Sequence, residues 1–177
     1  MEEEIFSAES DEEEEKKELD EDDKILKEVM KSMEASPNAS PFDWIENIIA
    51  ADDQLINLEV LKSKLTEIGV QEKVTYCVNG QDTIDQAKRI IQASVSKAQM
   101  GTTIKPINFL LLDFQMPQKN GVQVLKEIRT FYGYQQMNDN DVKIEEPVFV
   151  FLTAFMTPAF KKHLADLGVQ HIYEKPI

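Results

Sequence analysis

The stretch Phe109-Leu110-Leu111-Leu112-Asp113-Phe114-Gln115-Met116-Pro117 decides how this chain folds, and Asn120-Gly121 follows it closely. The apolar run has the length of a buried strand, and the proline, asparagine and glycine after it are typical of a turn. Asp113 is therefore expected where a core strand ends. In parallel sheets ligands bind beyond the carboxyl ends of the strands, so this carboxylate is a candidate for a functional site.

Three other predicted strands end in polar residues in the same way. They are residues 47–51 before Asp52-Asp53, residues 148–152 before Thr153, and residues 171–174 before Lys175. Because the carboxyl ends of parallel strands meet at one edge of a sheet, these side chains are expected to share one site.

Helical spacing of apolar residues separates the strands. The predicted strands are 47–51, 74–78, 107–112, 148–152 and 171–173, and the predicted helices are 55–68, 82–97, 122–131 and 159–167. Strands that are apolar on both faces and alternate with helices predict a doubly wound α/β domain with a five-stranded parallel sheet. The polar residues 132–146 are interpreted as a solvated loop, with a partner contact as the alternative.

The same alternation calls for one more helix after Lys175-Pro176, but the sequence ends at Ile177. We therefore expect the last helix to be missing and the domain to be C-terminally truncated, with the chain a fragment of a larger protein. The alternative is that a partner or the amino-terminal segment covers the apolar surface that such a helix would hide.

Acidic residues are concentrated at the amino terminus. The formal net charge is −14, and residues 1–40 contain 16 acidic residues against 5 lysines. Residues 1–41 are predicted to be a largely disordered acidic tail and linker, with a short amphipathic helix at 23–33 as one interpretation, and residues 42–177 to form the domain. A nearly neutral domain with an acidic tail disfavours binding to nucleic acid or to an anionic membrane surface.

Cysteine content and segment lengths bear on the compartment. Cys77 is the only cysteine, so the chain can form no internal disulfide. The acidic amino terminus lacks the pattern of a secretory signal, and no apolar run approaches the length of a membrane span. An intracellular, cytoplasmic protein is expected.

The expected site favours metal-assisted phosphoryl chemistry. Three carboxylates brought together by the sheet would repel one another, and Mg²⁺ would relieve that repulsion while keeping waters for phosphate oxygens. Lys175 and Thr153 suit the oxygens of a phosphoryl group, and one carboxylate is left to act as nucleophile. Taken singly, each residue has a simpler explanation, such as a helix-capping acid, a strand-end threonine or a solvated lysine.

Residues 46–176 resemble a receiver domain of two-component phosphorelay systems. The matching stretches are Ile48-Ile49-Ala50-Ala51-Asp52-Asp53, Leu110-Leu111-Leu112-Asp113-Phe114-Gln115-Met116-Pro117 with Asn120-Gly121, Leu152-Thr153-Ala154, and Glu174-Lys175-Pro176-Ile177. Two of these, Gln115-Met116-Pro117 and Lys175-Pro176-Ile177, are most similar to receivers attached to hybrid histidine kinases. The resemblance implies a flavodoxin-like sheet with strand order 2-1-3-4-5.

The resemblance also implies the role of each matching residue. Asp113 would accept a phosphoryl group from the phosphohistidine of a histidine kinase or a histidine phosphotransfer protein. The residues that would hold Mg²⁺ are Asp53, Asp113 and the backbone carbonyl of Gln115, with Asp52 acting through water. Those that would contact the phosphoryl group are Thr153, Ala154 and Lys175. The domain would be a switch that catalyses its own phosphorylation and phosphate loss, not a turnover enzyme on an external substrate.

One residue departs from the family pattern. The aromatic switch residue expected three positions before Lys175 is replaced by Ile172, and Tyr173 should point to the opposite face of its strand. This favours, as an alternative, a receiver-like binding scaffold that does not cycle phosphate. A phosphatase with an aspartyl nucleophile is a further alternative, but it would require a second acid where Gln115 stands.

Overall fold

The computed structural model describes residues 40–138, 141–154 and 156–175. The predictions of a disordered acidic tail and of a helix at 23–33 lie outside these residues. Among the helices of the described residues, none combines the length and apolar character needed to cross a membrane.

Five parallel strands form the central sheet, and their order confirms the prediction. They are β1 (Ile48–Ala51), β2 (Val74–Cys77), β4 (Phe109–Leu112), β6 (Val148–Thr153) and β7 (His171–Glu174). The spatial order is β2-β1-β4-β6-β7, which is 2-1-3-4-5 for these five strands. The ends of β1 and β4 are level, because Ala51 is paired with Leu112. The residues that follow them, Asp52 and Asp113, therefore emerge at the same edge of the sheet.

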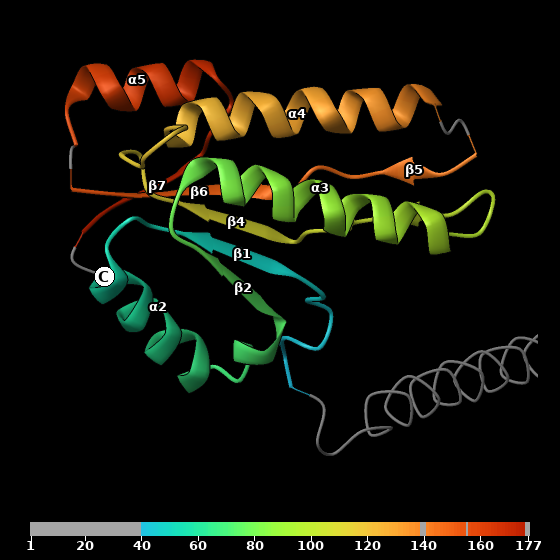
Figure 1. The fold of residues 1–177 in the computed structure, drawn as a ribbon, viewed down its shortest axis with the longest axis horizontal. Helices are drawn as coiled ribbons and strands as arrows, with labels where there is room; N and C mark the ends of the chain where they lie inside the picture. The colour runs from blue at the N-terminus through green and yellow to red at the C-terminus, as the bar shows by residue number, and fades with distance from the viewer. Residues whose placement is uncertain (1–39, 139–140, 155, 176–177) are drawn as a thin grey trace, which may run out of the picture. The chain divides into compact units, whose positions relative to one another are not determined.

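Helices cover both faces of this sheet (Figure 1). Those on one face are α3 (Gly80–Lys97), α4 (Gly121–Asn138) and α5 (Pro158–Asp166), whereas α2 (Leu55–Glu67) lies on the other and is followed by the short 3₁₀ helix Gln71–Lys73. The largest apolar cluster fills the space beneath α3, α4 and α5 and includes Ile84, Leu125, Phe151 and Leu164. Burial of this apolar surface is the main force that holds the layers together.

The prediction of a solvated loop at 132–146 was wrong in part. The helix α4 continues to Asn138, and Tyr132 is buried because it lies four residues after Ile128 and so repeats the apolar face of the helix. Residues Lys143–Ile144 form the strand β5, which pairs with β3 (Thr103–Ile104) in a separate two-stranded parallel sheet. The side-chain amide of Gln136 holds β5 to α4 by donating to the Val142 carbonyl and accepting from the Ile144 N–H.

The strand β7 places its two apolar side chains on different sides of the sheet. Ile172 packs against the main core, and Tyr173 is 52% exposed. Ile172 thus occupies the inward position, and Tyr173 is not able to replace an inward aromatic residue. Among the described residues, α2 is the only α-helix on its face of the sheet; the prediction of a missing final helix stays a prediction.

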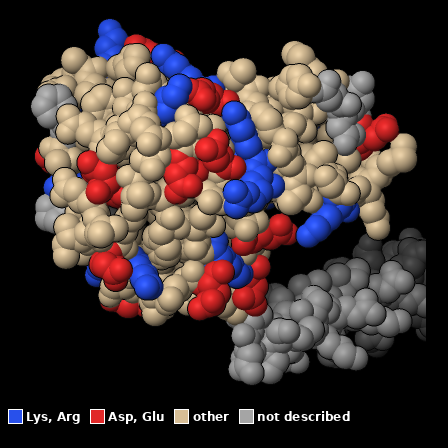
Figure 2. Space-filling view, viewed as in Figure 1, with Lys and Arg blue, Asp and Glu red and all other residues tan. Residues whose placement is uncertain are grey.

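Charged side chains are mixed on the molecular surface. Figure 2 shows lysine and arginine interspersed with aspartate and glutamate on the displayed face.

Candidate functional site

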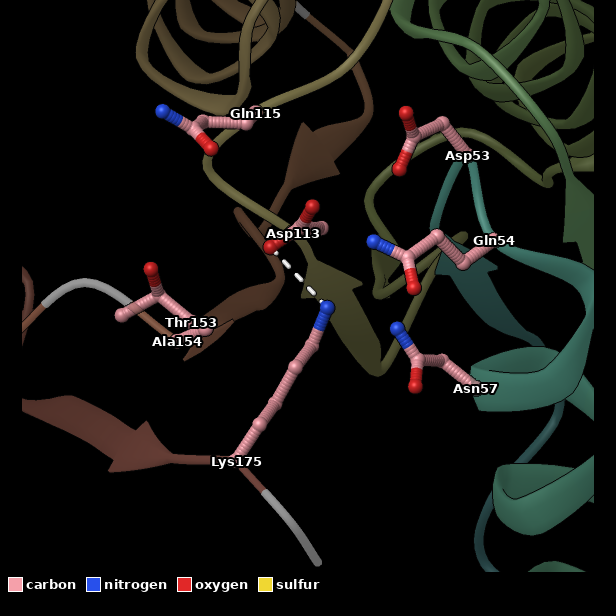
Figure 3. Close-up of a pocket in the computed structure, with 8 residues that line it drawn as sticks. All are labelled: Asp53, Gln54, Asn57, Asp113, Gln115, Thr153, Ala154 and Lys175. Atoms are coloured by element: carbon pink, nitrogen blue, oxygen red, sulfur yellow. Dashed lines mark ion pairs between the residues drawn. The ribbon is translucent and has the colours of Figure 1, made fainter.

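The polar residues predicted from the sequence meet in one cavity at the carboxyl edge of the sheet. The cavity has a volume of about 290 Å³ and is lined by Asp53, Gln54, Asn57, Asp113, Gln115, Thr153, Ala154 and Lys175. Figure 3 shows that these side chains come from both sides of the cavity, with Asp113 and Lys175 pointing toward each other. Asp52 is 1% exposed and contacts two of the lining residues, Asn57 and Lys175.

Two glycines fix the loop that follows Asp113. A Cβ on Gly121 would lie 2.5 Å from the backbone oxygen of Asp113, and a Cβ on Gly80 would lie 1.9 Å from the backbone oxygen of Lys119. The Gly121 N–H donates to the Phe114 carbonyl, and the Gly80 N–H donates to the Pro117 carbonyl. Only glycine allows both close approaches, so the loop holding Gln115 is clamped between the beginnings of α3 and α4.

Three carboxylates lie close together at the cavity. One oxygen from each of Asp52, Asp53 and Asp113 lies within 4.8 Å of the others. At this separation each pair repels by about 3 kcal/mol at an effective dielectric near 20, before water screens the exposed Asp53. Asp53 is the member that faces solvent, whereas Asp113 is 7% exposed.

Lys175 supplies the compensating positive charge. Its Nζ lies 2.5 Å from Asp52 Oδ2 and 3.0 Å from Asp113 Oδ1. The backbone fixes the origin of this side chain, because the Lys175 N–H donates to the Thr153 carbonyl at the end of β6. The ammonium thus pairs with two of the three carboxylates, and the site keeps an excess of negative charge.

Burial sets the protonation behaviour of Asp113. Loss of hydration raises the pKa of this carboxyl above its ordinary value, the hydrogen bond and charge of Lys175 lower it in part, and the Asp52 charge raises it further. A cation placed among the three acids would favour the ionised form of Asp113, which is the form that can act as a nucleophile.

The Asp52 carboxylate is held on both oxygens. Oδ1 accepts from the Gln54 N–H and from the Asn57 side-chain amide, each at 3.0 Å, and Oδ2 accepts from Lys175. Gln54 is the N-cap of α2, and its own side chain makes no capping hydrogen bond. Because Asp52 accepts from the N–H of this N-cap residue, it also helps to hold the start of α2, as the simple explanation expects of one of the two acids.

Two residues of the cavity were missed in the sequence. Gln54 and Asn57 belong to the cavity lining although no motif pointed to them. The available signal was closeness in the sequence, since both residues follow Asp52-Asp53 within five positions and lie where the predicted helix begins beside the expected site.

The remaining predicted residues lie on the opposite side of the cavity. Thr153 is buried at the end of β6, and Ala154 follows it as an exposed residue. Gln115 lines the cavity from the loop after Asp113 and provides an amide where a phosphatase would need an acid. The phosphatase alternative therefore has no general acid at this position.

The donor set fits a hard divalent cation. Asp53 and Asp113 line the cavity with their carboxylates close to each other, and Gln115 lines the same cavity from the loop after Asp113. Carboxylates and carbonyls are the ligands of Mg²⁺, which binds through one or two carboxylates and retains water. No cysteine or histidine lies in this donor set, so its oxygen chemistry does not favour softer metals.

Sequence comparisons find relatives among signalling proteins, although no family model matches the chain. The chain is 30% identical over 133 residues to the peroxide stress-activated histidine kinase mak1 of Schizosaccharomyces pombe, covering 74% of the chain and 7% of the kinase. It is 28% identical over 130 residues to the osmosensing histidine protein kinase SLN1 of Saccharomyces cerevisiae, covering 73% of the chain and 9% of the kinase. The chain spans only 5% to 10% of the length of the first relatives it matches, all histidine kinases.

A relative of similar size is the probable chemotaxis protein CheY of Rhizobium etli, which is 26% identical over 129 residues. That match covers 73% of the chain and 80% of the relative.

Solved structures share the fold. The chain matches a co-crystal structure of the Saccharomyces cerevisiae histidine phosphotransfer protein Ypd1 with the receiver domain of Ssk1, at a TM-score of 0.57 and 21% identity over 74% of the chain and 79% of the solved chain. It also matches the receiver domain of the Arabidopsis thaliana histidine kinase CKI1, which was solved with Mg²⁺ and BeF₃⁻. The TM-score is 0.55 and the sequence identity 18%, and the match covers 73% of this chain and 80% of the solved chain. The resemblance to receiver domains is thus confirmed in sequence relatives and in fold.

Proposed function

We propose that this chain is a phosphorelay receiver in which Asp113 accepts a phosphoryl group in the presence of Mg²⁺. The observation that carries the proposal is the joint position of Asp113 at the end of β4, beside two further acids and 3.0 Å from Lys175. This arrangement combines a buried nucleophile, a set of oxygen ligands and a fixed cation in one cavity. Each is needed to transfer a phosphoryl group to a carboxylate.

The acids are assigned separate tasks. Asp53, Asp113 and the Gln115 carbonyl would hold the metal, which supplies positive charge to phosphoryl oxygens when bound. Asp52 would act through water, since its oxygens already accept three hydrogen bonds from the protein. Its burial supports this assignment.

The chain's own residues then perform the transfer. A carboxylate oxygen of Asp113 attacks the phosphorus of a phosphohistidine, a P–O bond forms, and the P–N bond breaks with its electron pair returning to the imidazole of the donor. Lys175 and the Thr153 hydroxyl would bind phosphoryl oxygens, and the Ala154 N–H would donate to a third. Loss of the phosphoryl group to water returns the free carboxylate, so the domain is a switch and not a turnover enzyme.

The proposed donor is a histidine kinase or a histidine phosphotransfer protein. Support comes from the relatives that are histidine kinases, and from the Ssk1 receiver domain, which was solved with a histidine phosphotransfer protein. We place the receiver in residues 42–177 and the acidic tail and linker in residues 1–41. We expect the chain to work in the cytoplasm, and the single free cysteine, Cys77, fits such a reducing compartment.

Phosphorylation followed by peptide mapping tests the proposal. The full chain is incubated with Mg²⁺ and acetyl phosphate, or with a phosphorylated histidine phosphotransfer protein, and intact mass is recorded. We expect one phosphoryl group on the peptide containing Asp113, and no label in Asp113→Asn or in the presence of EDTA. If a control receiver is labelled under the same conditions and the native chain is not, the phosphoacceptor proposal fails.

That negative result would support a receiver-like scaffold. Ile172 is the specific observation that favours the scaffold, because an aliphatic side chain in the inward position lacks the aromatic ring that the family uses to report phosphorylation. The two readings make opposite predictions for the same mass measurement.

A further inference from the structure

Asp52 is the most constrained acid of the site. It is 1% exposed, and its carboxylate accepts hydrogen bonds from the Gln54 N–H, the Asn57 amide and Lys175. Two donors converge on Oδ1, so Oδ2 is left facing Lys175 Nζ at 2.5 Å. The direction of this carboxylate therefore fixes where the lysine ammonium lies.

Asn57 provides the only side-chain donor to Oδ1 among the described residues. It lies in the first turn of α2, and its backbone N–H donates to the Gln54 carbonyl. Because an ionised carboxylate only accepts hydrogen bonds, the contact with Asp52 fixes which end of the Asn57 amide faces the acid. The Gln54 N–H would hold the same oxygen whatever side chain stood at position 57, so the amide of Asn57 adds a separate constraint.

The effect reaches the nucleophile through one residue. Lys175 touches Asp52 on one side and Asp113 at 3.0 Å on the other. A continuous series of polar contacts thus runs from Asn57 through Asp52 and Lys175 to Asp113. Asn57 itself has no hydrogen bond to Asp113 or Lys175 among the described residues, so its influence passes through Asp52.

We propose that Asn57 is a positioning residue that aims Asp52 at Lys175, and so sets the place of the Lys175 ammonium beside Asp113. By holding Asp52 in this direction it also keeps that acid from direct contact with the metal and leaves direct coordination to Asp53 and Asp113. This inference rests on the proposed function for its catalytic consequence, but the position of Lys175 can be measured without any phosphorylation.

The first measurement is chemical labelling of lysine amines. The full chain is treated briefly with an acylating reagent in EDTA, and the extent of labelling at Lys175 is compared by mass spectrometry with that at exposed Lys62. We expect Asn57→Leu, which keeps the size of the side chain and removes the donor, to raise Lys175 labelling several-fold. Ser63→Ala, an exposed position on the same helix, is the matched control and should leave the labelling ratio unchanged.

The same substitution made in a second variant, Asp52→Ala, distinguishes a positioning role of Asn57 from a general loosening of the structure. In Asp52→Ala, Lys175 has already lost the carboxylate that Asn57 aims, so adding Asn57→Leu should cause no further rise in labelling. If Asn57→Leu raises Lys175 labelling equally in the native chain and in Asp52→Ala, Asn57 acts by stabilising the fold and not by aiming Asp52, and the proposal fails. Labelling of Lys175 in Asn57→Leu equal to that in the native chain would overturn the proposal.

The phosphorylation rate tests the catalytic consequence. We expect Asn57→Leu to lower the rate with acetyl phosphate about tenfold relative to Ser63→Ala, and to have no added effect in Asp52→Ala. If the native chain is not phosphorylated at all, the proposed function fails, whereas the labelling of Lys175 still decides whether Asn57 positions the lysine.

Discussion

The ammonium of Lys175, which follows β7, lies 3.0 Å from the carboxylate of Asp113, which follows β4. The strand β6 lies between these two strands, so the contact spans the width of a strand at the edge of the sheet. Lys175 is 123 residues from Asp52, its other partner. Such contacts exist only when the sheet is fully assembled, so the site should report on the integrity of the whole domain.

Mg²⁺ should stabilise the native chain. Ligands that bind only the folded state add about 2.7 kcal/mol at a concentration one hundred times the dissociation constant. We expect the melting temperature to rise with millimolar Mg²⁺, and Asp53→Asn to lose most of that rise. Glu72→Gln, an exposed acid away from the cavity, is the control and should keep it. An undiminished response in Asp53→Asn would remove Asp53 from the ligand set.

Lys175→Met should destabilise the metal-free domain. The Lys175 side chain is 12% exposed and contacts two buried acids, and loss of one partner of a buried ion pair costs about 3 kcal/mol. Urea unfolding in EDTA measures this loss. Mg²⁺ should restore more stability in the variant than in the native chain, because the ion replaces the missing positive charge. A smaller Mg²⁺ effect in the variant would contradict this electrostatic account.

Gly121→Ala and Gly133→Ala should change stability in opposite directions, although both glycines lie in α4. A Cβ on Gly121 would meet the Asp113 backbone oxygen at 2.5 Å and the Phe151 ring at 2.8 Å, whereas a Cβ on Gly133 would meet nothing within 4 Å. We expect Gly121→Ala to cost more than about 2 kcal/mol. Gly133→Ala should add about 0.5 to 1 kcal/mol, because alanine favours the helix. Chemical unfolding of both variants measures the difference, and equal effects would refute the close packing at Gly121.

Tyr132 should weaken the domain at alkaline pH. Burial raises the pKa of this phenol, and the negative charge of Glu146 raises it further. The backbone of Ile107 lies close enough to lower the pKa in part, although the hydroxyl makes no full hydrogen bond. A group whose folded pKa lies above its unfolded value contributes stability that is present below the unfolded pKa, about 10 for tyrosine, and is lost as the pH rises further.

The free energy of unfolding should therefore fall less steeply above about pH 10 in Tyr132→Phe than in the native chain. Both proteins contain the same lysines, so the loss of lysine charge at alkaline pH affects both free energies of unfolding equally. Phenolate absorbance gives a second readout, since Tyr132 should ionise only as the native domain unfolds. Identical alkaline profiles for the two proteins would show that Tyr132 has no such effect.

Most of the fold could be predicted from the sequence because the strands are short apolar runs that alternate with helical periods. The order of the five strands followed from the resemblance, and the meeting of Asp113, Thr153 and Lys175 followed from the rule that ligands bind beyond strand ends. These features depend on patterns that repeat along the chain, so they can be predicted without any knowledge of contacts between segments.

The parts that were missed depend on contacts between segments. The polar composition of residues 132–146 concealed the buried face of α4 and the strand β5, because Tyr132, Val142 and Ile144 are few among many polar residues. Asn57 was missed for a related reason. A polar residue at the start of a helix is ordinarily solvated, and only the direction of Asp52 gives it a partner.

The pairing of β3 with β5 closes a loop of backbone that contains the strand β4. Thr103 meets Lys143 and Ile104 meets Ile144, while β4, Asp113 and all of α4 lie between these two points in the sequence. This pairing joins the two ends of the segment that carries Asp113, so these ends lie side by side although many residues separate them in the sequence. Lengthening that segment by a few residues should therefore cost little stability, because the entropy of closing a loop grows only slowly with its length.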